Sequence, residues 1–162
     1  MQLEIEVRPY DDPDVTRMVA EVQAEYVVLY GGPDAAVVDP AEFAPPAGLF
    51  LVGLLDGTAV AMGGWRRLSS PDLSTTDAEI KRMYVSRAAR RQGLARRVLA
   101  EIERTAAAAG VARIVLNTGP EQPEAIALYE RAGYEPIPGF GHYACHSDAL
   151  FYGKALRVAA TP

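Results

Sequence analysis

The chain has 162 residues, of which 49% are hydrophobic and 23% charged, a balance typical of a globular domain rather than of a disordered segment. This length suits a single domain over 1–162, and the one cysteine, Cys145, excludes an intramolecular disulfide framework and a four-thiolate zinc site. The net charge of −5 argues against nucleic acid as a partner, and the absence of an apolar run near the ~18 residues that cross a bilayer argues against a membrane.

The N-terminal segment predicts a strand followed by an amphipathic helix. It has no basic and apolar leader, so we expect a cytoplasmic protein. Residues 3–7 alternate apolar and polar, as in a half-buried strand. Asp12 and Pro13 then favour a helix start, and apolar residues at helical spacing continue the helix to about Leu29. The Gly-, Pro- and Asp-rich chain over 30–48 predicts a long functional loop with room for one short helix.

Three strands are predicted next, the last of them irregular. Two apolar runs, 50–55 and 59–62, flank Asp56 and Gly57, a pair that favours a hairpin because both turn positions need a positive φ. The following strand, 78–85, alternates imperfectly, which suggests a β-bulge. The residues that cannot all share one face are Ile80, Met83, Tyr84 and Val85.

The C-terminal half predicts helices that alternate with strands. A helix opens within 90–110, a strand covers 111–117, a second helix covers 123–132, and final strands lie over 134–136 and 150–158. The full order is β-α-loop-β-β-β-α-β-α-β-β. Such an order predicts an α/β domain built on a mixed sheet.

Basic residues are concentrated between Lys81 and Arg97, where seven of the chain's sixteen lie and no acidic residue occurs. The turn after Val85 leads through Gly93 into a helix, whose free N–H groups and dipole would favour a phosphate. The alternative is a solvated helix start, because the turn matches neither the dinucleotide fingerprint nor the P-loop. The arginines placed to add contacts to phosphate oxygens are Arg90, Arg91 and Arg96.

Two segments carry a resemblance to a known family. Residues 90–95, Arg-Arg-Gln-Gly-Leu-Ala, resemble the [R/Q]-x-x-G-x-[G/A] acetyl-coenzyme A (acetyl-CoA) signature of the GNAT superfamily of N-acetyltransferases. Residues 125–134, Ala-Ile-Ala-Leu-Tyr-Glu-Arg-Ala-Gly-Tyr, resemble the helix that follows the next strand in that family, and the likeness covers essentially the whole chain. The resemblance implies the GNAT fold: a mixed, mostly antiparallel sheet whose central parallel strands splay apart, with helices on both faces.

The resemblance also implies how acetyl-CoA binds. Its pantetheine arm would lie between the strands over 80–85 and 111–117, and the turn and helix start after them would hold the pyrophosphate. Gln122 stands where many members have asparagine, so that contact departs from the family pattern. The implied cofactor-binding residues are Met83, Tyr84, Val85, Arg90, Arg91, Gln92, Gly93, Leu94, Ala95, Arg96, Asn117 and Gln122.

The activity implied by the resemblance is transfer of an acetyl group from acetyl-CoA to a primary amine of a small molecule or peptide, by direct attack in a ternary complex. Tyr129 matches the family tyrosine that acts as acid at the coenzyme sulfur, and the alternative is a tyrosine packed on a buried helix face. Glu79 matches the position of a carboxylate base that acts through water in several members. An ion pair between Glu79 and an arginine, or attack by the neutral amine without a base, are the alternatives. A backbone N–H near Val85 would stabilise the oxyanion.

The acceptor site is implied in the loops over 26–48 and 137–149, and the sequence does not name the acceptor. Asp34, Asp39 and Glu42 would attract a cationic amine, with solvated loop carboxylates as the alternative. Residues 140–143 would supply an aromatic wall.

Other functions stay open beside this one. His142, Cys145 and His146 lie close together but lack a fourth zinc ligand, so we expect no metal. A non-catalytic acyl-CoA-binding or sensor module on the same fold is the main rival, and a different phosphate-ligand protein is a third interpretation. The C-terminal pattern around Lys154 and Leu156 resembles many bacterial members, and a homodimer is also compatible with the resemblance.

Overall fold

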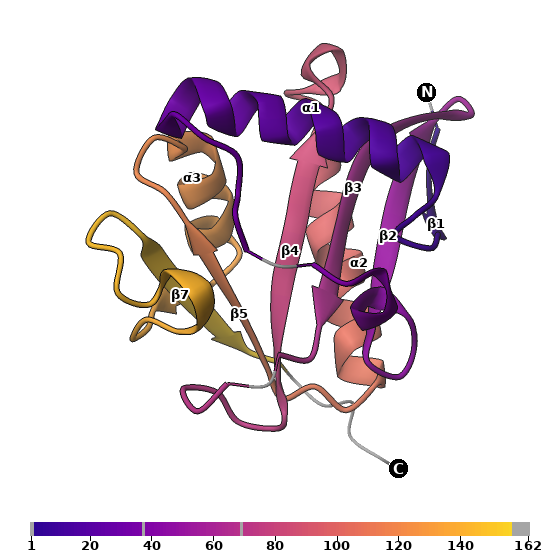
Figure 1. Cartoon of the computed structure of the whole chain (residues 1–162). Coiled ribbons are helices and arrows are strands. Elements are labelled where there is room, and N and C mark those ends of the chain that lie inside the picture. Colours follow the sequence, from indigo (N-terminus) through magenta and orange to yellow (C-terminus); the bar gives the residue numbers. More distant parts are fainter. Residues whose placement is uncertain (1, 37, 69, 157–162) are drawn as a thin grey trace.

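A computed structural model of the protein describes residues 2–36, 38–68 and 70–156 (Figure 1). In these parts of the chain, seven strands form one sheet in the order β1-β2-β3-β4-β5-β7-β6. The strands are β1 (Leu3–Val7), β2 (Gly48–Leu55), β3 (Thr58–Arg66), β4 (Asp77–Val85), β5 (Arg113–Thr118), β6 (Glu135–Pro136) and β7 (Leu150–Ala155). The helices are α1 (Pro13–Tyr30), α2 (Leu94–Ala108) and α3 (Pro123–Arg131), with short 3₁₀ turns η1 (Pro40–Phe43), η2 (Arg87–Ala89) and η3 (Gly141–Tyr143).

This architecture confirms the predicted α/β domain with a mixed sheet. The element order follows the prediction from β1 to β7, and the short helix expected within the long loop is η1. The last predicted strand, 150–158, ends at Ala155, and its residues 157 and 158 lie outside the described part of the chain.

Local signals place the ends of α1 and the β2–β3 hairpin. The Asp12 carboxylate accepts a hydrogen bond of 2.9 Å from the backbone N–H of Asp14, and Gly31, with a φ of 81°, ends the helix. Asp56 and Gly57 have φ values of 50° and 84°, the left-handed conformations that a tight hairpin turn requires. The sequence signals at these positions were therefore sufficient to predict the structure.

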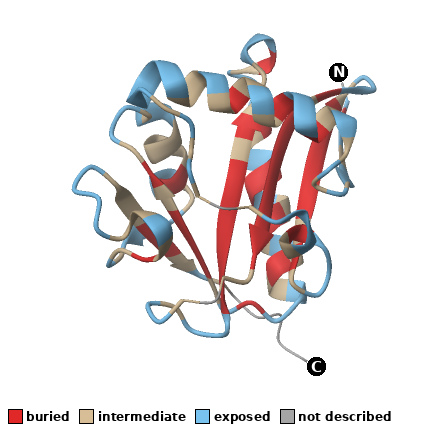
Figure 2. Ribbon diagram, in the orientation of Figure 1, coloured by how far each residue is buried: buried red, intermediate tan, exposed pale blue. Residues whose placement is uncertain are grey.

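The sheet is buried on both faces, and different helices cover them. Figure 1 shows α1 crossing in front of β2, β3 and β4, with α2 behind them, and Figure 2 shows these strands as the most buried part of the molecule. Phe50 and Val52 of β2 pack with Met18 of α1. Leu51, between them in sequence, packs with Leu99 of α2 on the opposite face. The alternation of side chains along a strand produces the two cores.

The centre of the sheet opens because β4 and β5 pair over only three residues. Parallel pairing joins 77–79 to 113–115 and then stops. Further along β4, Arg82 has a φ of 62° and the register against β3 shifts, which is the predicted bulge. Figure 1 shows the two strands diverging toward α1. Residues 80–85 of β4 consequently have no partner strand on the β5 side.

Gly64 of β3 provides a test of this packing. A Cβ at Gly64 would lie 2.5 Å from Cδ2 of Phe50 and 2.7 Å from the carbonyl oxygen of Leu49. We therefore expect Gly64→Ala to lower the free energy of unfolding by about 1–3 kcal/mol, the range for an overpacked core, in urea denaturation. Gly32→Ala is the control, because its added Cβ meets nothing within 4 Å. A loss in Gly64→Ala no greater than in this control would contradict the packing described.

Candidate functional site

A cavity of about 1260 Å³ opens where β4 and β5 diverge. Its walls come from the end of α1 and the following loop, from β4 and β5, from the starts of α2 and α3, and from the loop before β7. Residues 80–85 of β4 line it without interruption. Because β5 has left β4 before these residues, an extended ligand with amide groups can pair with β4 as an added strand does.

The residues predicted to pair with a pantetheine arm all lie on this wall. Met83, Tyr84 and Val85 line the cavity. The Tyr84 hydroxyl donates a 3.0 Å hydrogen bond to Glu21 of α1, which turns its ring toward that helix. The carbonyl of Val85 accepts a 2.9 Å hydrogen bond from Nε of Arg90, so this one group is already engaged.

The N-terminus of α2 forms another wall. Its N-cap residue, Gly93, has a φ of 77° and no side chain caps the helix, so the first N–H groups of α2 have no capping partner. Gly93, Leu94, Ala95 and Arg96 all line the cavity. Free N–H groups at the positive end of a helix dipole bind anions, which supports the predicted phosphate cradle.

The basic side chains around this helix start divide into two kinds. Arg91 and Arg96 are exposed, line the cavity and form no hydrogen bond or ion pair within the described parts of the chain. Arg90 is half-buried, contacts Glu25 of α1 at 2.6 Å and lies over the Tyr84 ring, 5.6 Å from its centroid. Arg90 therefore attaches α1 to the end of β4. It also lines the cavity, so its contact with a phosphate stays a prediction.

Gln92 also differs from its expected role. It is not among the residues that line the cavity, and its side-chain amide donates a 3.3 Å hydrogen bond to the carbonyl of Ala89. The left-handed conformation of the preceding residue, Arg91, with a φ of 68°, belongs to the turn that places Gln92 on its outer side. The Gln92 side chain thus supports the turn, and its contact with acetyl-CoA stays a prediction.

Tyr129 of α3 is both buried and part of the cavity wall. It is 5% exposed, and its ring meets that of Tyr134 edge-on at 5.6 Å. Its hydroxyl has no hydrogen-bond partner among the described residues. Burial raises the pKa of Tyr129 well above its ordinary value, so the hydroxyl stays protonated at neutral pH and can donate to a ligand. The two interpretations offered by the sequence, packing and function, are therefore compatible.

Asn117 and Gln122 line the wall between β5 and α3. Oε1 of Gln122 accepts hydrogen bonds from the hydroxyls of Tyr30, at 3.3 Å, and Thr118, at 3.2 Å. The longer amide that departs from the family pattern thus joins the end of α1 to β5. An added Cβ at Gly119 would overlap the Tyr30 ring, so a larger residue at this position would displace the Tyr30 side chain.

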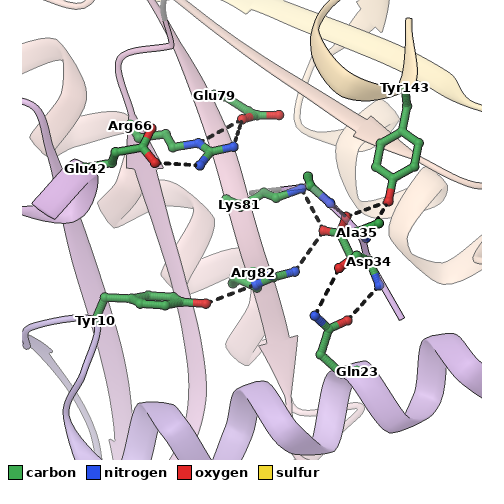
Figure 3. A network of polar contacts seen from close by, with 11 residues as sticks. Tyr10, Gln23, Asp34, Ala35, Glu42, Arg66, Glu79, Lys81, Arg82 and Tyr143 are labelled. Atoms are coloured by element: carbon green, nitrogen blue, oxygen red, sulfur yellow. Dashed lines mark hydrogen bonds and ion pairs between the residues drawn. The ribbon is translucent and has the colours of Figure 1, made fainter. Parts of the chain in front are cut away.

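Glu79 lies outside the cavity lining. It is buried on β4, and its Oε1 accepts from Nε and Nη2 of Arg66, at 3.1 and 3.0 Å (Figure 3). Arg66 also contacts Glu42 of η1 at 3.2 Å. These contacts match the ion-pair alternative, and the position of Glu79 does not support the general base expected from the resemblance.

Of the three carboxylates expected in the loop after α1, Asp34 lines the cavity. Its Oδ2 lies 2.7 Å from Nζ of Lys81 and 2.8 Å from Nη1 of Arg82. Its Oδ1 accepts a hydrogen bond from the Tyr143 hydroxyl, at 2.7 Å (Figure 3). The same oxygen accepts another from the backbone N–H of Ala36, at 3.0 Å. Although burial alone would raise the pKa of Asp34, the Lys81 charge and these hydrogen bonds lower it to about 2.

The other two loop carboxylates do not line the cavity. Asp39 caps η1 by accepting a 3.0 Å hydrogen bond from the N–H of Ala41, and Glu42 is bound to Arg66. The expectation that loop carboxylates attract a cationic amine is therefore not supported by the contacts of Asp34, Asp39 or Glu42. Tertiary contacts already occupy Asp34 and Glu42, and Asp39 caps its own turn.

The loop before β7 contributes His142, Tyr143 and His146 to the cavity, whereas Cys145 is exposed and lies outside its lining. Phe140, expected beside them in the aromatic wall, is buried and packs against Phe151 instead. Across residues 2–36, 38–68 and 70–156, no group of three or more His, Cys, Asp and Glu side chains is placed to hold a metal ion. No helix in that same part of the chain is both long enough and apolar enough to span a membrane.

Sequence reasoning missed Lys81 and Arg82 as cavity residues. Strict alternation would place them on opposite faces of β4, yet both line the cavity. The broken alternation after Ile80 was the available signal, because a bulge can bring two consecutive side chains to one face.

Comparison with known proteins decides the family. A model of the Acetyltransferase (GNAT) family matches residues 15–134. The chain belongs to the GNAT acetyltransferase family. A curated GNAT relative, the IAA acetyltransferase of Azospirillum brasilense, is 33% identical over 142 residues, which cover 88% of this chain and 90% of the relative.

Solved structures show the same GNAT fold. A Klebsiella pneumoniae protein described as an acyl-CoA N-acyltransferase has a TM-score of 0.79 and 26% identity, covering 96% of this chain and 99% of that one. The acetyltransferase YncA of Salmonella typhimurium, solved with acetyl-CoA, has a TM-score of 0.70 and 18% identity, covering 100% of this chain and 98% of that one. The comparisons confirm the predicted GNAT membership, fold and acyltransferase class.

The low pKa of Asp34 makes a testable contribution to stability. With a pKa near 4 when unfolded and about 2 when folded, Asp34 stabilises the protein fully above pH 4, and this contribution disappears as the pH falls toward 2. We expect Asp34→Asn to lower the free energy of unfolding by about 2 kcal/mol at pH 7, measured in urea. The difference between the wild type and the variant should become smaller in acid. The control is Asp11→Asn at an exposed position. A difference in unfolding free energy between the wild type and Asp34→Asn that stays constant from pH 7 to pH 3 would contradict the role assigned to Asp34.

Proposed function

We propose that the protein transfers an acetyl group from acetyl-CoA to a primary amine of a small molecule or peptide. The observation that carries this proposal is that the unpaired side of β4, over 80–85, and the uncapped start of α2 line one cavity. A strand edge suits the amides of a pantetheine arm, and a helix N-terminus suits a diphosphate. The acetyltransferase relative and the acetyl-CoA in the YncA structure add support.

The residues present fit the donor along its length. Backbone groups of Met83 and Tyr84 are available to the pantetheine amides, while the N–H groups of Leu94 and Ala95 face the diphosphate end. The exposed side chain of Arg96, at the same end, adds charge-assisted contacts to phosphate oxygens. When bound, acetyl-CoA supplies the thioester carbonyl that the amine attacks.

Tyr129 then acts at the leaving group. Its hydroxyl is protonated at neutral pH and faces the cavity without a protein partner among the described residues. As the carbon–sulfur bond breaks, Tyr129 gives its proton to the departing sulfur and regains one from solvent.

The acceptor enters as its neutral amine. Asp34 is unsuited to removing its proton, since a carboxylate with a pKa of about 2 is a weak base and its oxygens already accept four donors. Glu79 is bound to Arg66 outside the cavity lining. After attack, the proton of the new ammonium group leaves to water.

The donor is tested by thermal unfolding with acetyl-CoA, free coenzyme A, ATP and NAD in parallel. We expect both coenzyme A species to stabilise the protein by about 2.7 kcal/mol at a hundred times their dissociation constants, and ATP and NAD to have much smaller effects. An equal shift with ATP would identify a general phosphate site and contradict the proposal.

Matched variants of α2 sharpen that test. Ala95→Glu places a carboxylate where the diphosphate binds, and an acidic residue in the first turn also favours the helix. We therefore expect this variant to fold but not to be stabilised by coenzyme A. Ala100→Glu is the control, because Ala100 is exposed on the same helix and lies outside the cavity lining. We expect coenzyme A to stabilise this variant as it stabilises the wild type.

Tyr129→Phe tests the acid. We expect kcat with an accepting amine to fall about 100-fold while acetyl-CoA affinity is retained, measured by thiol release and calorimetry. Tyr134→Phe is the control, because its hydroxyl contacts Glu103 away from the cavity, at 2.9 Å. An unchanged kcat in Tyr129→Phe would remove Tyr129 from the mechanism. Acetyl-CoA binding without turnover on any amine would favour the sensor module instead.

A further inference from the structure

Two consecutive cations of β4 meet one carboxylate where the loop after α1 and the loop before β7 line the cavity, the end at which the resemblance implies the acceptor. Nζ of Lys81 and Nη1 of Arg82 both contact Oδ2 of Asp34 (Figure 3). The left-handed φ of 62° at Arg82 breaks the alternation of β4, which brings both side chains to the same face. Lys81 and Arg82 are only 5% and 7% exposed, and both line the cavity.

These charges do not balance within the cluster. Two cations face one carboxylate, which leaves one net positive charge. Glu79, two positions before Lys81, is bound to an arginine of β3 and contacts neither cation. Asp148, on the loop before β7, lines the cavity but is exposed and contacts neither cation. A buried cation is stabilised by an anionic partner, so this end of the cavity favours an anionic group.

Hydrogen-bond donors also remain on both cations. Arg82 uses Nε for the Tyr10 hydroxyl, at 3.2 Å, and Nη1 for Asp34, while its Nη2 has no partner in the described parts of the chain. Lys81 carries three donors and contacts Asp34 alone among the described residues. Asp34, by contrast, already accepts four donors. The cluster can therefore bind an acceptor of hydrogen bonds but not a further ammonium group.

We propose that the acceptor amine also carries a carboxylate, which Lys81 and Arg82 bind. This inference rests on the proposed function, since it names the acceptor class of the same cavity. A single net positive charge matches a monoanion, and lysine and arginine donors form strong charge-assisted hydrogen bonds with carboxylates. Amino acids therefore fit this end of the cavity, and polycationic amines do not.

The test compares amino acids with their neutral carboxamides. Wild-type protein is assayed for thiol release with L-phenylalanine, 4-aminobutyrate and 6-aminohexanoate, each beside its carboxamide, so that three distances between amine and carboxylate are sampled. Binding of each compound to the protein alone and to its coenzyme A complex is measured by calorimetry, which reads the site without turnover. We expect at least one acid to exceed its carboxamide about 10- to 100-fold in kcat/KM and in affinity.

The chain's two lysines provide a matched pair of variants. Lys81→Met leaves Arg82 and Asp34 as a balanced ion pair, and we expect the acid-to-carboxamide ratio to fall about 10- to 100-fold with acetyl-CoA affinity retained. Lys154→Met removes a lysine that pairs with Glu103 outside the cavity, and the ratio stays at the wild-type value. A structural role for Lys81 alone would lower stability without changing the ratio.

The outcomes separate this inference from the proposed function. Carboxamides bound and acetylated as well as every acid would overturn the carboxylate site and leave the acetyltransferase standing. No stabilisation by acetyl-CoA and no thiol release would overturn the proposed function, while calorimetry of the acids still decides the carboxylate site. Should Lys81→Met fail to fold, the wild-type ratio and Lys81→Gln decide the inference.

Discussion

The parting of β4 from β5 is the constraint on which the site depends. Hydrogen bonds between the strands end at Glu79 and Val115, and the left-handed conformation of Arg82 then bends β4 away from a regular strand. Backbone N–H and C=O groups that lose a strand partner need another partner, which is the physical basis for the proposed binding of an extended, amide-bearing ligand. The same conformation places Lys81 and Arg82 side by side. One backbone irregularity thus accounts for both the unpaired edge of β4 and the two adjacent cations that line the cavity.

Ion pairs, together with a buried aromatic residue, hold the long loop after α1. Asp34 is bound to Lys81, and Glu42 in η1 is bound to Arg66, so both contacts attach the loop to the central strands (Figure 3). Phe43 is buried in the core beneath α1. Buried charges cost free energy unless they are paired, so substituting one partner loosens the loop as well as the site. The proposed acceptor recognition and the order of the loop therefore both depend on the contact between Asp34 and Lys81.

At the start of α2, some residues of the family motif face the cavity, and one is held by a tertiary contact. Gly93 and the residues after it present free N–H groups to the cavity, as the motif predicts. The first arginine of the motif, Arg90, is instead held by Glu25 of α1, because α1 crosses the sheet close to the end of β4. Arg91 and Arg96 remain exposed at the cavity. One charged residue of a family signature can thus stabilise the structure around the site, while its neighbours remain available to a ligand.

The sequence by itself determined the order of elements, the hairpin at Asp56 and Gly57, the ends of the helices and the place of the bulge, because each depends on local conformational preference or on side-chain alternation. Its motifs over 90–95 and 125–134 also identified the family. Only the tertiary structure decided the partners of the charged side chains: Glu79 with Arg66, Arg90 with Glu25, and Lys81 together with Arg82 on Asp34. These pairs join residues far apart in the chain, and their formation depends on where strands, α1 and loops meet in space, which no local pattern encodes.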